Sequence, residues 1–203
     1  MKASLKLFAC VVAVAVSLFC ASTTQCHAAT ENFIGKANAP VTIVEYASLT
    51  CSHCADFYAQ VMPEFEKRYI ETGKVRFIYR DFPMDAIGLR AATLAHCMPS
   101  EQFYPFIKVL FNNQASWLRS PKPEDMLIRY AEMAGLPSEK ARTCVTNTEI
   151  MDKLIATQTE ATKKYDIAAT PTFIINDGEE KVIGVRTIED LGATIDKYLA
   201  KKK

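Results

Sequence analysis

The pattern of hydrophobic and polar positions changes twice in the first part of the chain, and the three segments predict a strand, a helix and a second strand. The apolar and β-branched run "VTIVEYAS" from Val41 predicts the first strand. The helical spacing that follows, up to Gly73, predicts a helix with Pro63 as a kink and Gly73 as its end. The expected buried face of this helix is Ala55, Tyr58, Ala59, Met62, Phe65, Glu66 and Tyr69. "KVRFIYRDF" predicts the second strand, so the two strands should be parallel.

The middle of the chain carries only helical spacing, from about Asp85 to about Tyr165. Strand signal returns at "TPTFIINDGEEKVIGV", where "NDGEE" supplies the turn of a hairpin, and "TIEDLGATIDKYLAKK" predicts a final amphipathic helix. The order is strand, helix, strand, then helices, then strand, strand, helix. We therefore expect an α/β domain with one small mixed sheet, built from residues 30–84 and 166–203, with residues 85–165 as a helical insertion.

The N-terminal segment has the pattern of a secretory signal. Lys2 and Lys6 precede the apolar stretch "LFACVVAVAVSLFCA", which is shorter than the roughly 18 residues of a membrane-spanning helix. Small residues follow, so cleavage after Ala28 or Ala29 is plausible, and residues 1–29 are predicted to be a signal peptide. A retained membrane anchor is an alternative, and lipid attachment is a weaker one because bulky residues precede the later cysteines of this segment.

Composition describes an ordinary globular protein. Of the 203 residues, 49% are hydrophobic and 23% are charged, and the net charge is +1 at pH 7. Without Lys2 and Lys6 the net charge is about −1, so there is no electrostatic case for binding nucleic acid. The remaining length of about 174 residues suits one compact domain.

Cysteine usage agrees with an exported protein. The chain has seven cysteines, three of which fall in the predicted signal peptide. The four that remain are Cys51, Cys54, Cys97 and Cys144. An even number in an oxidising compartment favours disulfides over free thiols, although the count does not assign the pairs.

The segment "CSHC" combines two cysteines at the junction of the first strand and the helix. At a helix N-terminus, unpaired N–H groups stabilise a negative charge, so Cys51 should be an acidic thiol, and His53 adds a donor or a positive charge nearby. Cys54 lies one helical turn further on, where it can bond to Cys51. Two unequal thiols are what thiol–disulfide exchange requires. A structural bridge is an alternative, and zinc is disfavoured because the only other histidine after residue 29 is His96.

A second candidate feature is the proline in "AATPTF". Pro171 begins a strand, and a cis Thr170–Pro171 bond there would present the backbone of Thr170 to an extended peptide. A Thr-Pro pair has little specificity by itself. Its value comes from its place after the helical insertion and before the closing hairpin and helix.

Together these features resemble the DsbA family of thiol–disulfide oxidoreductases, which have a thioredoxin fold with a helical insertion. The resemblance rests on "VEYASLTCSHC", "ATPTF" and the strand–strand–helix end, and extends from about Phe33 to Leu199. It implies that Cys51 is the attacking thiol and Cys54 the resolving thiol, with Thr170–Pro171 in the loop beside them.

The same resemblance assigns two supporting residues and shows two departures. It makes His53 the family's histidine before the second cysteine and Glu45 a buried acid that assists proton transfer at the resolving thiol; Glu45 could equally be an ordinary strand-end carboxylate. Ser52 stands where the best-known oxidases carry proline, and Thr170 is shared with more reducing or isomerising relatives. Both departures bear on whether the cysteine pair acts as an oxidant, or as a reductant or isomerase.

The two remaining cysteines, Cys97 and Cys144, fall in predicted helices of the insertion. They resemble those of an alphaproteobacterial subset of the family that carries a second disulfide in the insertion. The alternative is two buried free cysteines, which pack well as small apolar residues. We favour a structural Cys97–Cys144 bridge beside a redox-active Cys51–Cys54 pair.

The expected function is therefore that of a periplasmic dithiol oxidase that needs no metal or organic cofactor. Its partners would be unfolded or reduced exported proteins and, by resemblance only, a membrane reoxidase of the DsbB or VKOR type. The protein is expected to be a monomer. A disulfide reductase or isomerase is the first alternative, and a binding protein that keeps the fold without turnover is the second.

Overall fold

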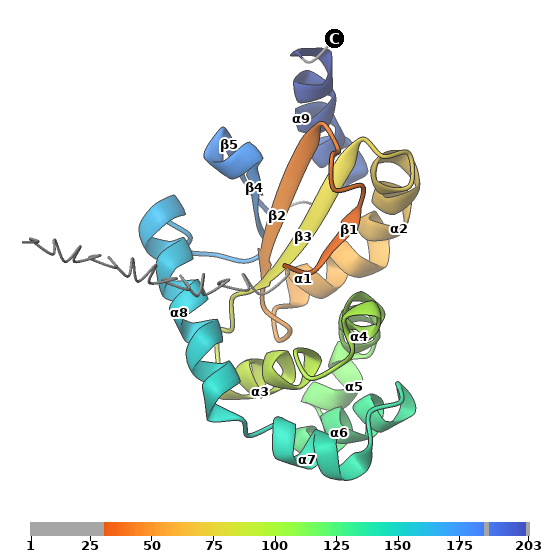
Figure 1. Ribbon diagram of the computed structural model, residues 1–203, viewed down its shortest axis with the longest axis vertical. Coiled ribbons are helices and arrows are strands. Elements are labelled where there is room, and N and C mark those ends of the chain that lie inside the picture. The colour runs from red at the N-terminus through yellow and green to blue at the C-terminus, as the bar shows by residue number, and fades with distance from the viewer. Residues whose placement is uncertain (1–30, 185–186, 202–203) are drawn as a thin grey trace, which may run out of the picture. The chain divides into compact units, whose positions relative to one another are not determined.

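A five-stranded mixed sheet forms the centre of the computed structural model, which describes residues 31–184 and 187–201 (Figure 1). The spatial order is β1-β3-β2-β4-β5. β2 and β3 are parallel, as expected, and the other neighbours are antiparallel. The strands are β1 (Phe33–Gly35), β2 (Val41–Ala47), β3 (Val75–Asp81), β4 (Thr172–Ile175) and β5 (Glu180–Ile183). The predicted signal peptide lies outside the described residues.

The helical region after β2 departs from a regular α-helix in two places. It consists of α1 (Ser52–Asp56), a π-helical turn η1 (Phe57–Val61), α2 (Met62–Phe65) and a second π-helical turn η2 (Glu66–Ile70). The expected irregularity at Pro63 takes the form of the wider turn η1 just before it, where the N–H of Met62 bonds to the carbonyl five residues earlier. Gly73, at φ +74°, lies in the turn that follows, as predicted.

The π turns change which residues of this region face the core. Ala59, predicted to be buried, is exposed, whereas Phe57 and Val61 are buried. Each π turn holds one more residue than an α turn, so the apolar face moves around the axis in a way that a constant helical period does not anticipate.

Six helices follow between β3 and β4. They are α3 (Ala86–Ala95), α4 (Ser100–Asn112), α5 (Gln114–Leu118), α6 (Pro123–Met133), α7 (Ser138–Cys144) and α8 (Thr148–Tyr165). The hairpin then leads to α9 (Ile188–Lys201). Residues from Glu31 onward form one compact unit, whose main core contains side chains of the sheet and of the helices alike. Across the described ranges, no helix combines the length and the apolar character needed to cross a membrane.

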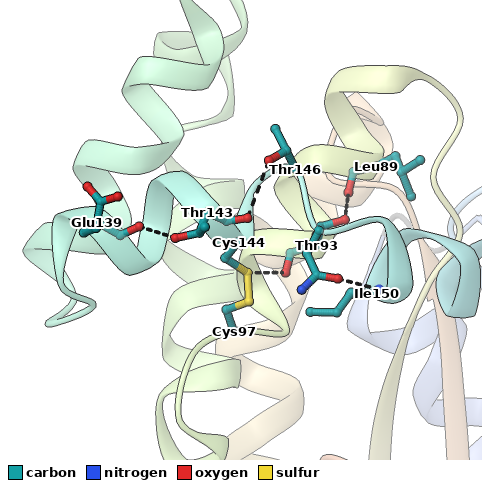
Figure 2. Close-up of a disulfide and its surroundings, with 9 residues drawn as sticks. Leu89, Thr93, Cys97, Glu139, Thr143, Cys144, Thr146 and Ile150 are labelled. Atoms are coloured by element: carbon teal, nitrogen blue, oxygen red, sulfur yellow. Dashed lines mark hydrogen bonds between the residues drawn. A yellow bond between two sulfur atoms is a disulfide. The ribbon is translucent and has the colours of Figure 1, made fainter.

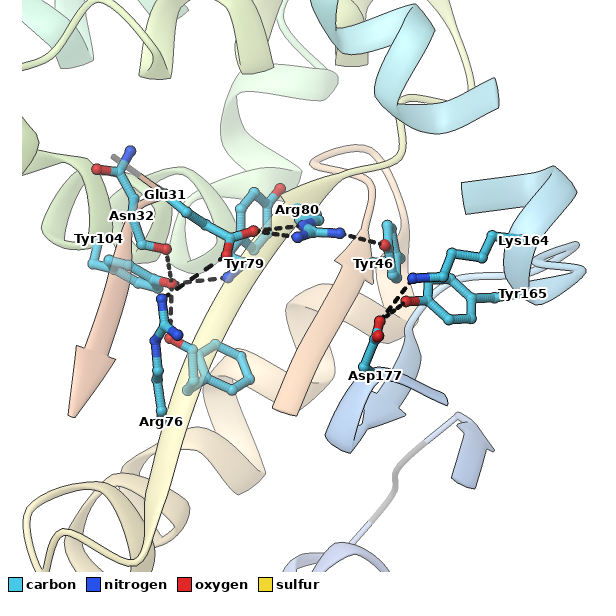
Figure 3. Close-up of polar contacts among 11 residues, drawn as sticks. Glu31, Asn32, Tyr46, Arg76, Tyr79, Arg80, Tyr104, Lys164, Tyr165 and Asp177 are labelled. Carbon is cyan, nitrogen blue, oxygen red and sulfur yellow. Dashed lines mark hydrogen bonds and ion pairs between the residues drawn. The ribbon is translucent and has the colours of Figure 1, made fainter. Parts of the chain in front are cut away.

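The two faces of the sheet carry different layers. α1 and α2 pack on one face in the main core, while α8 returns along the other face, where Ala161 packs with Val44 and Ile78 (Figure 1). Polar contacts link the sheet to neighbouring segments. The Tyr104 hydroxyl accepts the N–H of Tyr79 at 2.8 Å and lies 3.1 Å from two backbone carbonyls, and salt bridges Glu31–Arg80 and Asp177–Lys164 flank the sheet (Figure 3).

Candidate active site

The two cysteines of the "CSHC" segment lie at the start of α1, as predicted. Cys51 is the N-cap residue, with an extended backbone (φ −78°, ψ 120°), and its carbonyl accepts the N–H of Ala55 at 3.2 Å. Cys51 is partly buried and Cys54 is fully buried. Both are free thiols in this structure, so the redox-active bond between them remains a prediction.

Their surroundings make the two thiols unequal. The hydrogen bond from the Cys54 thiol, followed by contributions from the Thr170 side chain and from the N–H groups of Cys54 and His53, outweighs partial burial and lowers the pKa of Cys51 to about 5. Burial, the same hydrogen bond and the negative charge of Glu45 raise the pKa of Cys54. At neutral pH the partly exposed sulfur is therefore a thiolate and the buried one is a thiol.

The loop at Thr170–Pro171 lies against the first thiol. The Thr170–Pro171 peptide bond is cis, and the Cys51 sulfur lies 3.3 Å from the carbonyl oxygen of Thr170, which accepts its hydrogen bond only when Cys51 is protonated. A cavity of about 440 Å³ opens beside this contact, lined by His53, Asp56, Gln60, Ala169, Thr170, Ile183 and Gly184. The structure thus brings the two predicted motifs together across 119 residues of sequence.

Ser52 and His53 occupy the exposed side of the first turn of α1. His53 acts on Cys51 through its backbone N–H. Its imidazole lines the cavity next to Thr170. The side chain is therefore placed to meet a bound partner.

Glu45 lies in β2 beneath the thiol pair and has no exposed surface. Its Oε2 accepts a hydrogen bond from the Tyr58 hydroxyl at 3.2 Å, while its Oε1 has no partner. Burial raises the pKa of Glu45 to about 8; the bond from Tyr58 opposes this shift and the negative charge of Cys51 adds to it. A carboxyl that titrates near neutral pH beside Cys54 can give a proton to that sulfur or take one from it.

One residue of the site was not predicted from the sequence. Gln114, at the start of α5, is buried, and its Nε2 donates to the carbonyl oxygens of Leu49 and Cys51, both at 2.9 Å. The helical insertion therefore fixes the backbone of the loop that carries the nucleophile. Nothing in "FNNQAS" distinguishes this glutamine from its polar neighbours, because its role depends on tertiary contacts.

The predicted second disulfide is present. Cys97, just after α3, is bonded to Cys144, the last residue of α7, with a Cα–Cα distance of 6.4 Å (Figure 2). Cys144 is buried and its sulfur lies 3.4 Å from the carbonyl oxygen of Thr93. The bridge joins two helices of the insertion.

A five-stranded sheet with a thiol pair at the start of its first long helix and a cis-proline beside that pair defines a thioredoxin-type protein. The thioredoxin family model matches residues 27–197. The crystal structure of alpha-DsbA1 from Wolbachia pipientis is similar, with 34% identity and a TM-score of 0.77 over 86% of this chain and 96% of that one. The chain belongs to the thioredoxin family and, within it, to the DsbA proteins.

Other similarities are more distant or partial. A Rickettsia felis protein named as a protein-disulfide oxidoreductase is 30% identical over 171 residues, which are 84% of this chain but 60% of the relative. The chain thus spans about 60% of the length of that curated relative. The oxidised form of BdbD from Bacillus subtilis is 22% identical with a TM-score of 0.71, covers 84% of this chain and 93% of its own, and shares the fold.

Proposed function

We propose that the protein is a thiol–disulfide oxidoreductase that introduces disulfide bonds into exported proteins in the periplasm. The observation that carries the proposal is the inequality of the two thiols: the pKa of Cys51 is lowered to about 5 and that of Cys54 is raised. Stabilising the thiolate of the reduced pair makes the corresponding disulfide a stronger oxidant. This favours an oxidase over a reductase or isomerase, although Ser52 and Thr170 depart from the best-known oxidases.

The geometry supports the following sequence of steps. A substrate thiolate attacks Cys51 Sγ of the oxidised pair, the Cys51–Cys54 bond breaks, and Cys54 leaves with the electron pair and takes a proton from Glu45. A second substrate thiolate then attacks the substrate sulfur of the mixed disulfide and releases Cys51 as its thiolate. Two electrons pass from the substrate to the pair, and the substrate gains a disulfide. Thr170, the neighbour of Cys51, is placed to contact the bound peptide backbone.

The assignment of the two thiols is tested by trapping. Cys54→Ala leaves Cys51 able to form a mixed disulfide but removes the thiol that reverses it, so partners should accumulate as high-mass species that disappear on reduction. Cys51→Ala should give few, because Cys54 is buried and protonated at neutral pH. Equal trapping by the two variants would mean that the nucleophile is wrongly assigned.

A second experiment tests whether the Cys51–Cys54 pair is an oxidant or a reductant. The purified protein is equilibrated with mixtures of reduced and oxidised glutathione, and the fraction of Cys51–Cys54 disulfide is measured. An oxidase should remain reduced until the mixture is strongly oxidising, and it should oxidise a reduced, unfolded protein stoichiometrically. A pair that is already oxidised in a reducing mixture would favour the reductase or isomerase alternative. Failure of any exchange would leave the binding-protein alternative.

The cellular setting of the proposal rests on the sequence. Residues 1–29 support export to the periplasm. After each cycle the Cys51–Cys54 pair is reduced and must be reoxidised, and a membrane reoxidase of the DsbB or VKOR type would accept its electrons. Fractionation of cells tests the location. Accumulation of the reduced protein when a candidate reoxidase is deleted tests the partner.

A further inference from the structure

Three buried side chains on one face of the sheet each carry an oxygen atom without a hydrogen-bond partner. These atoms are Glu45 Oε1, Tyr79 Oη and Asp81 Oδ1. Over the described ranges, only one other buried side-chain polar atom, Arg76 Nε, is in the same state. Buried polar atoms are normally satisfied, so their concentration in one place needs an explanation.

The backbone places the three side chains in a row. Glu45 of β2 and Tyr79 of β3 are paired in register on neighbouring parallel strands, and Asp81 follows Tyr79 by two residues. All three therefore point to the same face. The Tyr58 hydroxyl is bonded to Glu45 Oε2, and its ring meets that of Tyr79 edge-on, with centroids 6.5 Å apart. The oxygen of Glu45 that remains unpartnered is Oε1.

The other end of the row reaches solvent through a histidine. Asp81 Oδ2 lies 2.7 Å from His96 Nε2; the Asp81 side chain is 3% exposed and that of His96 is 34% exposed. Burial disfavours the charged imidazole, but the hydrogen bond and negative charge of Asp81 outweigh it and raise the pKa of His96. His96 can therefore hold a proton at the surface beside a buried carboxylate.

Aromatic rings separate the row from bulk water. Phe103 packs beside His96 and Tyr79, with ring centroids 5.0 Å and 6.0 Å away. Phe111 stacks on Tyr58 at 4.3 Å and meets Tyr79 at 6.3 Å. These two residues of α4 therefore cover the row on that side.

We propose that His96, Asp81 and Tyr79 form a proton path between solvent and the buried carboxyl of Glu45. The role rests on the proposed exchange function, in which Glu45 gives its proton to Cys54. The carboxylate of Glu45 then accepts the hydroxyl proton of Tyr79. Tyr79 regains a proton from Asp81, which receives it from His96, and His96 takes one from solvent. The net result is the transfer of one proton from solvent to the Cys54 sulfur.

The groups around the path that can carry charge are few. Cys51, Glu45 and Asp81 can carry negative charge, and the imidazole of His96 can carry positive charge next to Asp81. The neighbouring hydroxyl of Tyr104 on α4 is already engaged with the backbone of β3, at 2.8 Å from the N–H of Tyr79. Tyr104 is therefore a matched control, because its hydroxyl is buried nearby but its hydrogen bonds go to backbone groups and not to the side chains of the path.

Hydrogen–deuterium exchange of the Cys54 thiol measures the path when all variants carry Cys51→Ala, which removes the partly exposed sulfur to which Cys54 otherwise donates. The reduced protein is mixed rapidly into deuterium oxide, and the infrared S–H stretching band of Cys54 is isolated by subtracting the spectrum of Cys54→Ala. We expect Tyr79→Phe and His96→Ala each to slow the loss of this band by about tenfold or more. Tyr104→Phe should exchange at the wild-type rate.

Added imidazole separates a proton path from a general loss of packing. Imidazole should restore exchange in His96→Ala, where the lost group reached solvent, and should leave Tyr79→Phe slow, where the missing hydroxyl is enclosed. Circular dichroism confirms that the variants are folded. Wild-type exchange in Tyr79→Phe, or equal acceleration of both variants by imidazole, would overturn the proposal.

This measurement does not depend on disulfide exchange with a partner. If the protein oxidises no substrate while Tyr79→Phe still slows S–H exchange, the proposed function fails and the proton path stands. If substrate oxidation proceeds and S–H exchange is the same in all variants, the path fails and the function stands.

Discussion

The two cysteine pairs of this protein contain the same atoms in opposite settings. Cys51 and Cys54 are separated by one helical turn, and the sulfur of Cys51 receives N–H donors from the start of α1. Cys97 and Cys144 are 47 residues apart, they are bonded to each other, and the Cys144 sulfur is buried. Donors around a sulfur stabilise its thiolate and hence the reduced state, whereas a long closed loop favours the bonded state. Surroundings therefore determine which pair can react and which one holds the fold together.

The largest expected effect is on oxidase activity, which should depend on the Cys51–Cys54 pair and not on the Cys97–Cys144 pair. Cys51→Ser should abolish oxidation of a reduced, unfolded protein, because the serine hydroxyl cannot form the mixed disulfide. The double variant Cys97→Ala/Cys144→Ala should keep most of the wild-type rate when assayed well below its melting temperature. Loss of activity in the folded double variant would contradict the division of roles.

The second expected effect is on the free energy of unfolding, which should depend more on the Cys97–Cys144 pair than on the Cys51–Cys54 pair. Removing the Cys97–Cys144 bridge should lower the free energy of unfolding by up to about 4 kcal/mol, because the unfolded chain regains the freedom of a 47-residue loop. Chemical denaturation of the double variant measures this loss. Cys51→Ser serves as the comparison and should cost less. An unchanged denaturation midpoint in the double variant would contradict the prediction.

A third prediction concerns pH and the carboxyl beneath the reactive pair. Because the pKa of Glu45 is raised from its ordinary value of 4.5 to about 8, the folded state holds this proton more tightly than the unfolded state. The contribution of Glu45 to the stability of the reduced protein should therefore be lost as the pH rises from 4.5 to 8, by a few kcal/mol in order of magnitude, while the lowered pKa of Cys51 acts in the opposite direction in both proteins compared. Glu45→Gln should remove this loss, so its advantage over the wild type should grow across that range. Parallel curves for the two proteins in pH-dependent denaturation would contradict it.

A smaller effect is expected at the contact between the insertion and the reactive pair. Gln114→Met preserves the volume of the side chain but removes the donor to the carbonyls of Leu49 and Cys51, so the loop should loosen. The pKa of Cys51 should rise by roughly one unit or less, as measured by thiolate absorbance. Gln102→Met, at an exposed position of α4, is the control. A larger shift in the control would show that Gln114 does not position the nucleophile.

The smallest effect is expected for His53→Ala. The backbone N–H that acts on Cys51 is retained in alanine, and the imidazole is exposed, where solvent screens its charge. The pKa of Cys51 should rise by less than in Gln114→Met. A shift of two units would instead assign the main stabilisation of the thiolate to the imidazole.

Local patterns in the sequence were sufficient to predict the strand–helix junction at Cys51, four of the five strands and the helical middle. The strand β1 was missed because three residues carry no detectable alternation. The burial of Ala59 was predicted wrongly because the π turns change the helical period. Gln114, Tyr79, Asp81 and His96 could not be assigned a role because their partners are distant in sequence and are defined only by packing.

The contacts of Cys51 with distant residues have a consequence for the order in which the site is built. Its carbonyl accepts a hydrogen bond from Gln114, 63 positions later, and its sulfur lies against the carbonyl of Thr170, 119 positions later. Until both have folded into place, Cys51 has the donors of its own helix but neither the fixed backbone nor the cis-proline loop beside it. The site is therefore complete only after the chain has folded as far as Thr170.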